Sequence, residues 1–177
     1  PYPNSPDKRA IIHGMYLGNA SYWVIDRLTI DSAGASAVLL TGGASHNVFN
    51  KVDAYNFKEG IYIQHGSDYN TVQNSTLHDQ VLTDRAAIGI NSWDISKPNP
   101  DSRHTRILDN EIWNVTDAIQ LLGGIDADED YAGTIIYNNE FYITSARYTD
   151  CHGAFAVTGD CACAENAIDL KSGSSDS

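Results

Sequence analysis

The sequence has few of the residues on which several classes of protein depend. Its 177 residues include 11 lysines and arginines against 23 aspartates and glutamates, so the formal net charge is −12. Non-specific binding to nucleic acid or to anionic membranes needs a basic face, and this charge balance argues against both partners. No apolar run approaches the roughly 20 residues that cross a bilayer. Strong helix formers are sparse and methionine occurs once, so no long window has a helical period.

Small polar residues and short apolar runs make up most of the chain instead. Asn, Asp, Gly, Ser and Thr separate brief stretches of β-branched and aromatic residues, a pattern that predicts many short strands joined by turns. Hydrophobic residues make up 42%, enough for a core in one domain spanning residues 1–177. Because the chain opens at Pro1 and stops just after an expected strand, we expect a piece of a longer protein, incomplete at both ends.

Two families of short segments alternate along the chain, which indicates an internal repeat. The first family comprises residues 21–30, 45–54, 69–78, 104–113 and 132–141. Aligning its members puts an apolar residue in one column: Val24, Val48, Val72, Ile107 and Ile136. Two positions later comes an acid or amide: Asp26, Asn50, Asn74, Asp109 and Asn138. We expect these polar side chains to stack at a buried turn, which would also hide the glycosylation sequon at Asn74.

The second family has the period-two alternation of a half-buried strand and comprises residues 37–43, 60–67, 87–94, 118–125 and 167–174. One inward column contains Val38, Ile61, Ile88, Ile119 and Ile168. The next contains Leu40, Ile63, Ile90, Leu121 and Leu170. Each repeat is therefore one coil with at least two short strands, and coils must stack to bury their apolar faces.

This pattern predicts an all-β fold, a right-handed parallel β-helix of about five coils. An antiparallel sandwich is the alternative, although hairpin signals such as Asn-Gly are absent. The coils lengthen through insertions at 92–102, 123–133 and 145–163, which in a solenoid become loops beside a binding face. The second insertion carries an acidic cluster, Asp126, Asp128, Glu129 and Asp130, which we interpret as a solvated loop rather than a calcium loop.

All three cysteines, Cys151, Cys161 and Cys163, lie in the longest insertion. They predict a disulfide that staples the loop in an oxidising compartment, and hence a secreted or cell-surface protein. A zinc site that includes His152 is the alternative, with a weak match to common zinc spacing. Besides Asn74, sequons occur at Asn19 and Asn114.

Outward positions of the second family suit a sugar ligand, because amides bond hydroxyl groups and aromatic rings stack on sugar rings. The residues that we expect to bind substrate are Tyr62, Gln64, Asn91, Trp93 and Gln120. An ordinary solvated sheet face explains the same columns equally well.

Charged residues concentrate at 165–171, where alternation puts Glu165, Asp169 and Lys171 on one face. Asp117 stands one coil earlier, in the position that Asn166 holds in the last coil, so it should lie about one strand spacing, ~4.8 Å, away. Carboxylates that converge on a rigid face suit a hard cation such as calcium. A surface ion pair between Asp169 and Lys171 is the alternative interpretation.

This segment resembles the Glu-x-Ala-Val/Ile-Asp-Ile-Lys strand of the pectate lyases, which are right-handed β-helix enzymes. The resemblance implies that Glu165, Asp169 and Asp117 bind calcium and that Lys171 contacts a uronate carboxylate. It also implies β-elimination from an acidic polysaccharide, in which calcium acidifies the C5 proton and a base removes it.

The catalytic arginine of the pectate lyases has no match in this chain, which leaves the enzyme class open. Arg85 or His65 could serve as the base instead, beside Lys171. A non-catalytic β-helix, such as an adhesin, surface filament or scaffold unit, is the first alternative. A glycoside hydrolase on the same fold is the second, since two carboxylates could flank a glycosidic bond.

Overall fold

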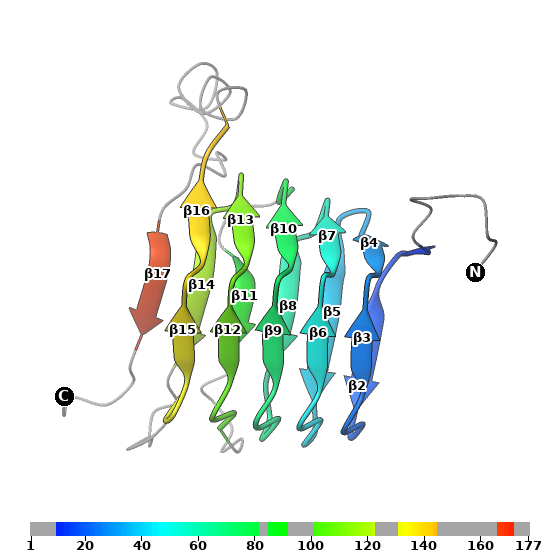
Figure 1. Cartoon of the computed structure of the whole chain (residues 1–177), viewed down its shortest axis with the longest axis vertical. Helices are drawn as coiled ribbons and strands as arrows, with labels where there is room; N and C mark the ends of the chain where they lie inside the picture. Colours follow the sequence, from blue (N-terminus) through cyan, green and yellow to red (C-terminus); the bar gives the residue numbers. More distant parts are fainter. Residues whose placement is uncertain (1–9, 82–84, 92–100, 123–130, 145–165, 172–177) are drawn as a thin grey trace.

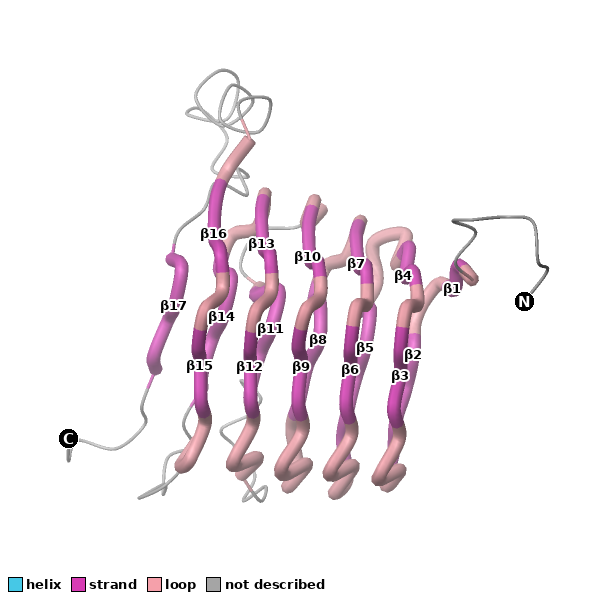
Figure 2. The backbone as a smooth tube through the Cα atoms, viewed as in Figure 1, coloured by secondary structure: helices cyan, strands magenta, loops and turns pink. Residues whose placement is uncertain are grey.

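The structure is a computed structural model that describes residues 10–81, 85–91, 101–122, 131–144 and 166–171 (Figure 1). Seventeen short strands form in these residues, and no helix does (Figure 2). A membrane-spanning helix is therefore absent from the described part of the chain.

The strands form three sheets whose members lie side by side from the N-terminal to the C-terminal end of the molecule (Figure 1). Sheet A consists of β1 (Ile11–Ile12), β4 (Thr29–Asp31), β7 (Asp53–Tyr55), β10 (Thr76–His78), β13 (Glu111–Trp113) and β16 (Glu140–Tyr142). Sheet B consists of β2 (Met15–Gly18), β5 (Ser36–Thr41), β8 (Glu59–Ile63), β11 (Ala86–Ile90), β14 (Asp117–Leu122) and β17 (Asn166–Lys171). Sheet C consists of β3 (Val24–Asp26), β6 (Val48–Asn50), β9 (Thr71–Gln73), β12 (Arg106–Leu108) and β15 (Ile135–Tyr137).

Every strand pairing is parallel, and the chain visits sheets B, C and A in turn, one strand in each. The described residues contain five such triplets, from β2–β4 to β14–β16, stacked through four steps. The prediction of a parallel β-helix is confirmed, and an antiparallel sandwich is excluded. Each coil has three strands, because the first family of segments spans one strand of sheet C and one of sheet A.

The interior is a stack of aliphatic columns, and the two columns predicted for sheet B are confirmed by its register. Ile61, Ile88 and Ile119 pair in succession and are all fully buried. Burial fails at the C-terminal end, where Ile168 and Leu170 continue the columns but are 42% and 59% exposed. An interior column is buried only where a coil covers it on both sides.

The predicted column of sheet C is wrong in the first two coils. Val48 pairs with Thr71, whereas Phe49 pairs with Val72, so the alignment slipped by one residue between β6 and β9. The buried residues are Phe49 and Ile25, whereas Val24 is exposed. The coil that joins β6 to β9 is one residue shorter than the coil before it, and a one-residue slip sends every side chain of a strand to the opposite face.

The predicted column of acids and amides does stack, but at an exposed turn: Asn50 Nδ2 donates to Asp26 Oδ1 (2.6 Å), Asn74 Nδ2 to Asn50 Oδ1 (2.9 Å) and Asn138 Nδ2 to Asp109 Oδ1 (2.6 Å). Asn74 is exposed and left-handed, with φ of 50°, so the expectation that its sequon is buried is wrong. The buried stack at the turn from sheet B to sheet C consists of Asn47 and Asn70, whose Oδ1 atom accepts hydrogen bonds from the Asn47 amide (2.9 Å) and side chain (3.1 Å). Asn110 and Asn139 repeat this contact at the turn from sheet C to sheet A, at 2.9 Å between side chains.

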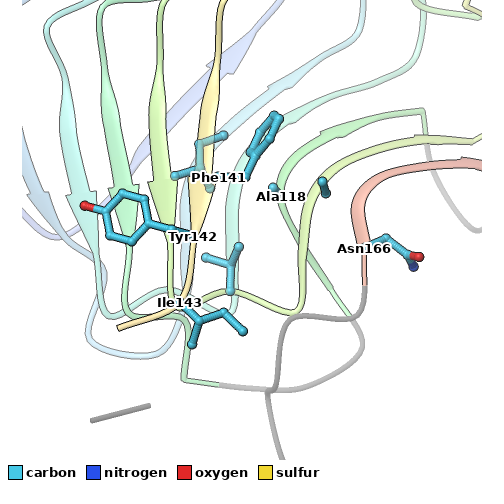
Figure 3. A pocket seen from close by; sticks show the side chains of 8 residues that line it. Ala118, Phe141, Tyr142, Ile143 and Asn166 are labelled. Carbon is cyan, nitrogen blue, oxygen red and sulfur yellow. The ribbon is translucent and has the colours of Figure 1, made fainter. Parts of the chain in front are cut away.

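An apolar cavity of about 180 Å³ lies at the C-terminal end, between strands of sheets A and B (Figure 3). Its lining includes Phe141 and Ala118, with Asn166 as the polar side chain at one side. Ile112, Val115 and Ala118, which also line it, belong to the buried core, so the cavity continues the interior of the solenoid. A lining of this kind offers no set of hydroxyl-binding groups and sets the cavity apart from the polar site below.

Candidate functional site

The outward face of sheet B carries the residues that the sequence singled out. Leu39, Tyr62, Gly89, Gln120 and Asp169 lie in one column, because each pairs with the next across β5, β8, β11, β14 and β17. This register confirms the predicted order of the column. The chemistry of the face changes along the axis, from apolar at β5 to acidic at β17.

Tyr62 packs across the neighbouring coil, because position 89 is glycine. A methyl group on Gly89 would lie 2.5 Å from Cζ of the Tyr62 ring, so only glycine leaves room for the ring. Tyr62 is 4% exposed, and its hydroxyl is buried without a hydrogen bond of acceptable geometry. Burial raises the pKa of Tyr62 to about 12, with a smaller contribution from the Glu59 carboxylate and a small opposing effect of the Ala86 backbone.

Two carboxylates meet at one amide on the neighbouring strands β14 and β17. Gln120 Nε2 donates to Asp117 Oδ2 at 3.2 Å and to Asp169 Oδ2 at 3.0 Å. Asn166 Nδ2 donates to the other oxygen of Asp117 at 3.0 Å, and Lys171 Nζ contacts Asp169 Oδ2 at 2.8 Å. We call these five residues the β14–β17 cluster. The structure thus brings four predicted site residues, Asp117, Gln120, Asp169 and Lys171, to one place.

The negative charges of Asp117 and Asp169 are stabilised by hydrogen-bond donors and by the Lys171 ammonium group as well as by solvent. Asp117 is 3% exposed, and the Asp169 side chain is 14% exposed. Burial by itself would raise the pKa of Asp169, but the hydrogen bonds from Lys171 and Gln120 outweigh it and hold the pKa below its usual value. Asp169 is therefore an ionised carboxylate at neutral pH, and its negative charge can attract a bound cation or the Lys171 ammonium group.

The other predicted substrate and metal residues lie apart from this cluster or outside the described residues. Glu165 and Trp93 are not among the described residues, and neither are the three cysteines and the acidic cluster at 126–130. Asn91 is buried and bridges two backbone groups, donating to Leu122 O (3.0 Å) and accepting from Ser102 N (2.8 Å). Gln64 is half-buried at the end of β8.

The two candidate bases flank neighbouring strands of sheet B, Arg85 at the start of β11 and His65 beyond the end of β8. Arg85 directly precedes β11, and its Nε atom is 3.2 Å from Glu59 Oε1. His65 follows β8, and its Nδ1 atom is 2.8 Å from Thr41 Oγ1. Ala86, the residue after Arg85, pairs with Asp117 of the neighbouring strand β14, so the backbone of Arg85 lies about one strand spacing, ~4.8 Å, from that strand of the cluster. His65 follows β8, which is two strand steps from β14 and three from β17, so the structure does not bring His65 to the β14–β17 cluster.

His65 instead lines an open groove of about 760 Å³ at the corner between sheets B and C. The groove crosses three coils and is lined by Gly42, Gly43, His65, Gly66, Asp68, Asp101 and Arg103. Its charged groups already contact one another: the Arg103 amide donates to Asp68 Oδ1 at 2.7 Å, and the Arg103 side chain lies 3.6 Å from Asp101. These contacts support the corner structure.

Two stacks of aromatic rings run along the solenoid, and the sequence analysis missed both. On sheet A, Tyr55, His78, Trp113 and Tyr142 stack at 4.3–5.4 Å between ring centroids. At the corner between sheets B and C, Tyr22, His46, Tyr69 and His104 stack at 4.5–4.9 Å. The rings are nearly parallel, so each inner ring is covered by a neighbour on both faces, whereas Tyr22 at the end of its stack is 76% exposed. Both stacks join successive coils through ring contacts.

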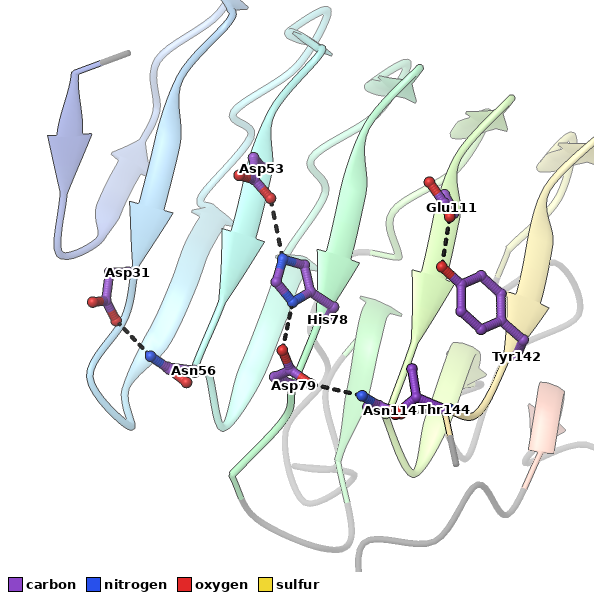
Figure 4. A network of polar contacts seen from close by, with 9 residues as sticks. All are labelled: Asp31, Asp53, Asn56, His78, Asp79, Glu111, Asn114, Tyr142 and Thr144. Carbon is purple, nitrogen blue, oxygen red and sulfur yellow. Dashed lines mark hydrogen bonds and ion pairs between the residues drawn. The ribbon is translucent and has the colours of Figure 1, made fainter. Parts of the chain in front are cut away.

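His78 links the sheet A stack to a chain of polar contacts (Figure 4). Its two ring nitrogens lie 2.7 Å from Asp79 and 3.2 Å from Asp53, and Asp79 in turn accepts from Asn114 at 2.7 Å. Burial alone would lower the pKa of His78, but the hydrogen bonds to Asp53 and Asp79 outweigh it and raise the pKa above the usual 6.5.

We expect His78 to make stability depend on pH. Because its pKa is raised in the folded protein, the charged ring stabilises fully below the unfolded pKa of about 6.5, and this contribution is lost as pH rises through the folded pKa. The loss of unfolding free energy caused by His78→Gln should therefore be larger at about pH 5.5 than at about pH 9. Urea unfolding at both pH values measures it, and an equal loss at both would contradict the assignment.

Comparison with known proteins gives one family. A family model described as a right-handed β-helix region matches residues 13–171. No curated protein and no solved structure matches the chain. The chain belongs to the right-handed β-helix family, and this fold supports a carbohydrate-active or a surface β-helix protein.

Proposed function

We propose that the chain binds acidic polysaccharide on the outward face of sheet B and cleaves it by β-elimination, as a secreted polysaccharide lyase. The observation that carries the proposal is the β14–β17 cluster, where Asp117 and Asp169 share one amide and Lys171 stands beside them. The Lys171 side chain is 46% exposed, so its ammonium group can approach a uronate carboxylate from solvent.

Calcium fits this cluster by the chemistry of its donors. Two carboxylates and an amide oxygen are hard ligands, and Gln120 Oε1 is a buried acceptor without a hydrogen-bond partner. When bound, calcium would neutralise a uronate carboxylate and acidify the neighbouring C5 proton. Asp117 and Asp169 would hold the ion, and Glu165 stays a predicted ligand from the sequence. Lys171 would orient the uronate through its carboxylate.

The elimination also needs a base for the C5 proton, followed by departure of the glycosidic oxygen from C4. Lys171 is the basic member of the cluster, with its Nζ atom 2.8 Å from Asp169 Oδ2. To accept a proton it must first lose one, and its ion pair with Asp169 favours the charged form. An approaching cation would compete for the same Asp169 oxygen and weaken this pair. Lys171 therefore combines a substrate-binding role with that of candidate base.

A glycoside hydrolase is the second candidate, favoured by the spacing of the two carboxylates. One nitrogen contacts both, at 3.2 and 3.0 Å, so the contacting oxygens are at most about 6.2 Å apart. Retaining glycosidases use carboxyl groups about 5–5.5 Å apart. A non-catalytic surface protein is the third, favoured by the distance of His65 from the cluster and by the regular stacks that stiffen the solenoid.

Incubation with polygalacturonate, alginate and glycosaminoglycans in the presence of calcium tests the reaction. A lyase produces unsaturated uronides, which we expect to see as a rise in ultraviolet absorbance that Asp169→Asn reduces by about a hundredfold or more. Thr76→Ala, on the outward face of sheet A, is the matched control and should retain activity. New reducing ends without the absorbance would indicate the hydrolase, and neither signal would indicate the non-catalytic protein.

A further inference from the structure

The carboxamide of Gln120 is oriented by its neighbours and has one end without a partner. The side chain is 1% exposed, and its Nε2 atom contacts a carboxylate oxygen of Asp117 and another of Asp169. An amide oxygen in that position would face two negative oxygens, so the nitrogen must be there. The orientation leaves Oε1 buried with no hydrogen-bond donor, an arrangement that costs free energy in a folded protein.

The nitrogen occupies the place between the two carboxylates that a cation would take. The contacting oxygens of Asp117 and Asp169 are at most about 6.2 Å apart, since both lie near Gln120 Nε2. Calcium binds oxygen at about 2.3–2.6 Å, so oxygens on opposite sides of one ion are about 5 Å apart. Even from that upper limit, an approach of about 1 Å by the two side chains is enough to reach the spacing in a calcium site. The register of β14 and β17 fixes the backbone on which they move.

Resting on the proposed function, we propose that Gln120 is an amide ligand of the divalent cation held by Asp117 and Asp169. Without the cation, Nε2 bridges the carboxylates; with it, the carboxamide turns over and Oε1 coordinates the ion. The turn satisfies the unpartnered oxygen, and a withdrawal of the side chain by about one metal–oxygen bond length, ~2.4 Å, leaves the place between the carboxylates to the ion. Lys171 contacts the same Asp169 oxygen as Gln120 does, so the cation also releases its ammonium group toward the substrate.

A bridging role alone predicts the opposite effect on affinity. If Gln120 only clamps the carboxylates, its amide competes with the cation, and removing the amide strengthens binding or leaves it unchanged. If Gln120 is a ligand, removing it weakens binding. The variant Gln120→Met keeps the length of the side chain and has no amide, so the sign of its effect separates the two roles. Gln73→Met, at the end of β9 on sheet C, is the matched control.

Calcium titration by calorimetry on the full chain is the experiment, with terbium luminescence lifetimes in light and heavy water as a second readout of bound waters. We expect Gln120→Met to bind calcium about tenfold more weakly and to hold one more water on terbium than the wild type, with Gln73→Met unchanged. Gln120→Glu, which keeps an oxygen ligand and adds charge, should bind about tenfold more tightly with no added water. If Gln120→Met does not fold, the calcium affinity of Gln120→Glu tests whether Gln120 is a ligand.

Each failure has its own meaning. Equal or tighter binding by Gln120→Met overturns the role of Gln120 while leaving the cation site in place. If Gln120→Met does not fold, an unchanged affinity in Gln120→Glu overturns it. No calcium or terbium binding by the wild type overturns both this inference and the cation in the proposed function, whereas binding of polysaccharide is measured independently of it.

Discussion

Replacing Phe49 with alanine is expected to lower the free energy of unfolding by about 3–5 kcal/mol. Phe49 is fully buried in β6 and is one of the largest buried side chains of the core. It pairs with Ile25 on one side and Val72 on the other, so its ring fills the interior across three coils. Removing the ring leaves a cavity in a parallel stack that has little freedom to collapse. Urea unfolding followed by far-UV circular dichroism measures the change.

Val48→Ala is the matched control, because Val48 is the neighbouring residue that the repeat alignment had placed inside. It is half-buried on the outward side of β6, so we expect a loss of about 1 kcal/mol or less. Similar losses for the two variants, or a larger loss for Val48→Ala, would contradict the register that pairs Phe49 with Val72.

The second large effect is expected at Asn70, whose side chain is fully buried. Its Nδ2 atom donates to the carbonyls of Ala44 and Ser67, both at 2.8 Å, and its Oδ1 atom accepts from Asn47. Asn70→Ala leaves these buried backbone groups without partners, at about 1–3 kcal/mol for each group that stays unpaired. We expect a total loss of about 3 kcal/mol in the free energy of unfolding, measured by urea unfolding.

Asn74→Gly is the control for that variant. Asn74 is exposed and has a φ of 50°, a conformation that glycine adopts without strain. Its side chain makes one exposed hydrogen bond, to Asn50 at 2.9 Å, so a loss below about 1 kcal/mol is expected. If Asn74→Gly were as damaging as Asn70→Ala, the buried asparagine stack would be the one that the sequence alignment suggested.

The fold was predictable because the residues that build sheet B repeat without ambiguity. Columns such as Ile61, Ile88 and Ile119 are aliphatic at alternate positions, and parallel stacking requires the same alternation in every coil. Sheet C was less predictable, because β6 and β9 both place β-branched or aromatic residues on two adjacent positions. Val48 and Phe49 could each point into the core. The coil from β6 to β9, which is one residue shorter than the coil before it, aligns Phe49 rather than Val48 with the buried Val72.

The aromatic stacks had a signal in the sequence that this slip partly concealed. Tyr69 stacks on His46, but the alignment put Tyr69 one position earlier, in the column of Ser45. On sheet A no slip intervenes, and the rings of His78 and Trp113 occupy the same position of consecutive copies. Attention to aromatic residues at one offset in each repeat would have found that stack.

The candidate site was predictable in its carboxylates and not in the residue that joins them. Period-two alternation and the repeat put Asp117 near Asp169, and the structure brings them to one amide. Gln120 was predicted to bind sugar because it lies in the outward column. A sequence pattern indicates which face of a strand a side chain is on, but it does not show which hydrogen bonds that side chain makes. The predicted role of His65 depended on distances across the sheet that alternation alone does not give.

The central claim is that the outward face of sheet B binds acidic polysaccharide, and electrophoresis of the native protein through gels containing polygalacturonate, alginate or a glycosaminoglycan tests it most directly. With calcium present, we expect at least one of these polymers to retard the wild type, Lys171→Met to weaken the retardation by about tenfold in apparent affinity, and Asp169→Asn to remove most of it. Arg106→Met, on sheet C, removes the same charge elsewhere and should migrate like the wild type in the same gels. Unretarded migration of the wild type in all three polymers, or equal retardation of wild type and Lys171→Met, would contradict the claim.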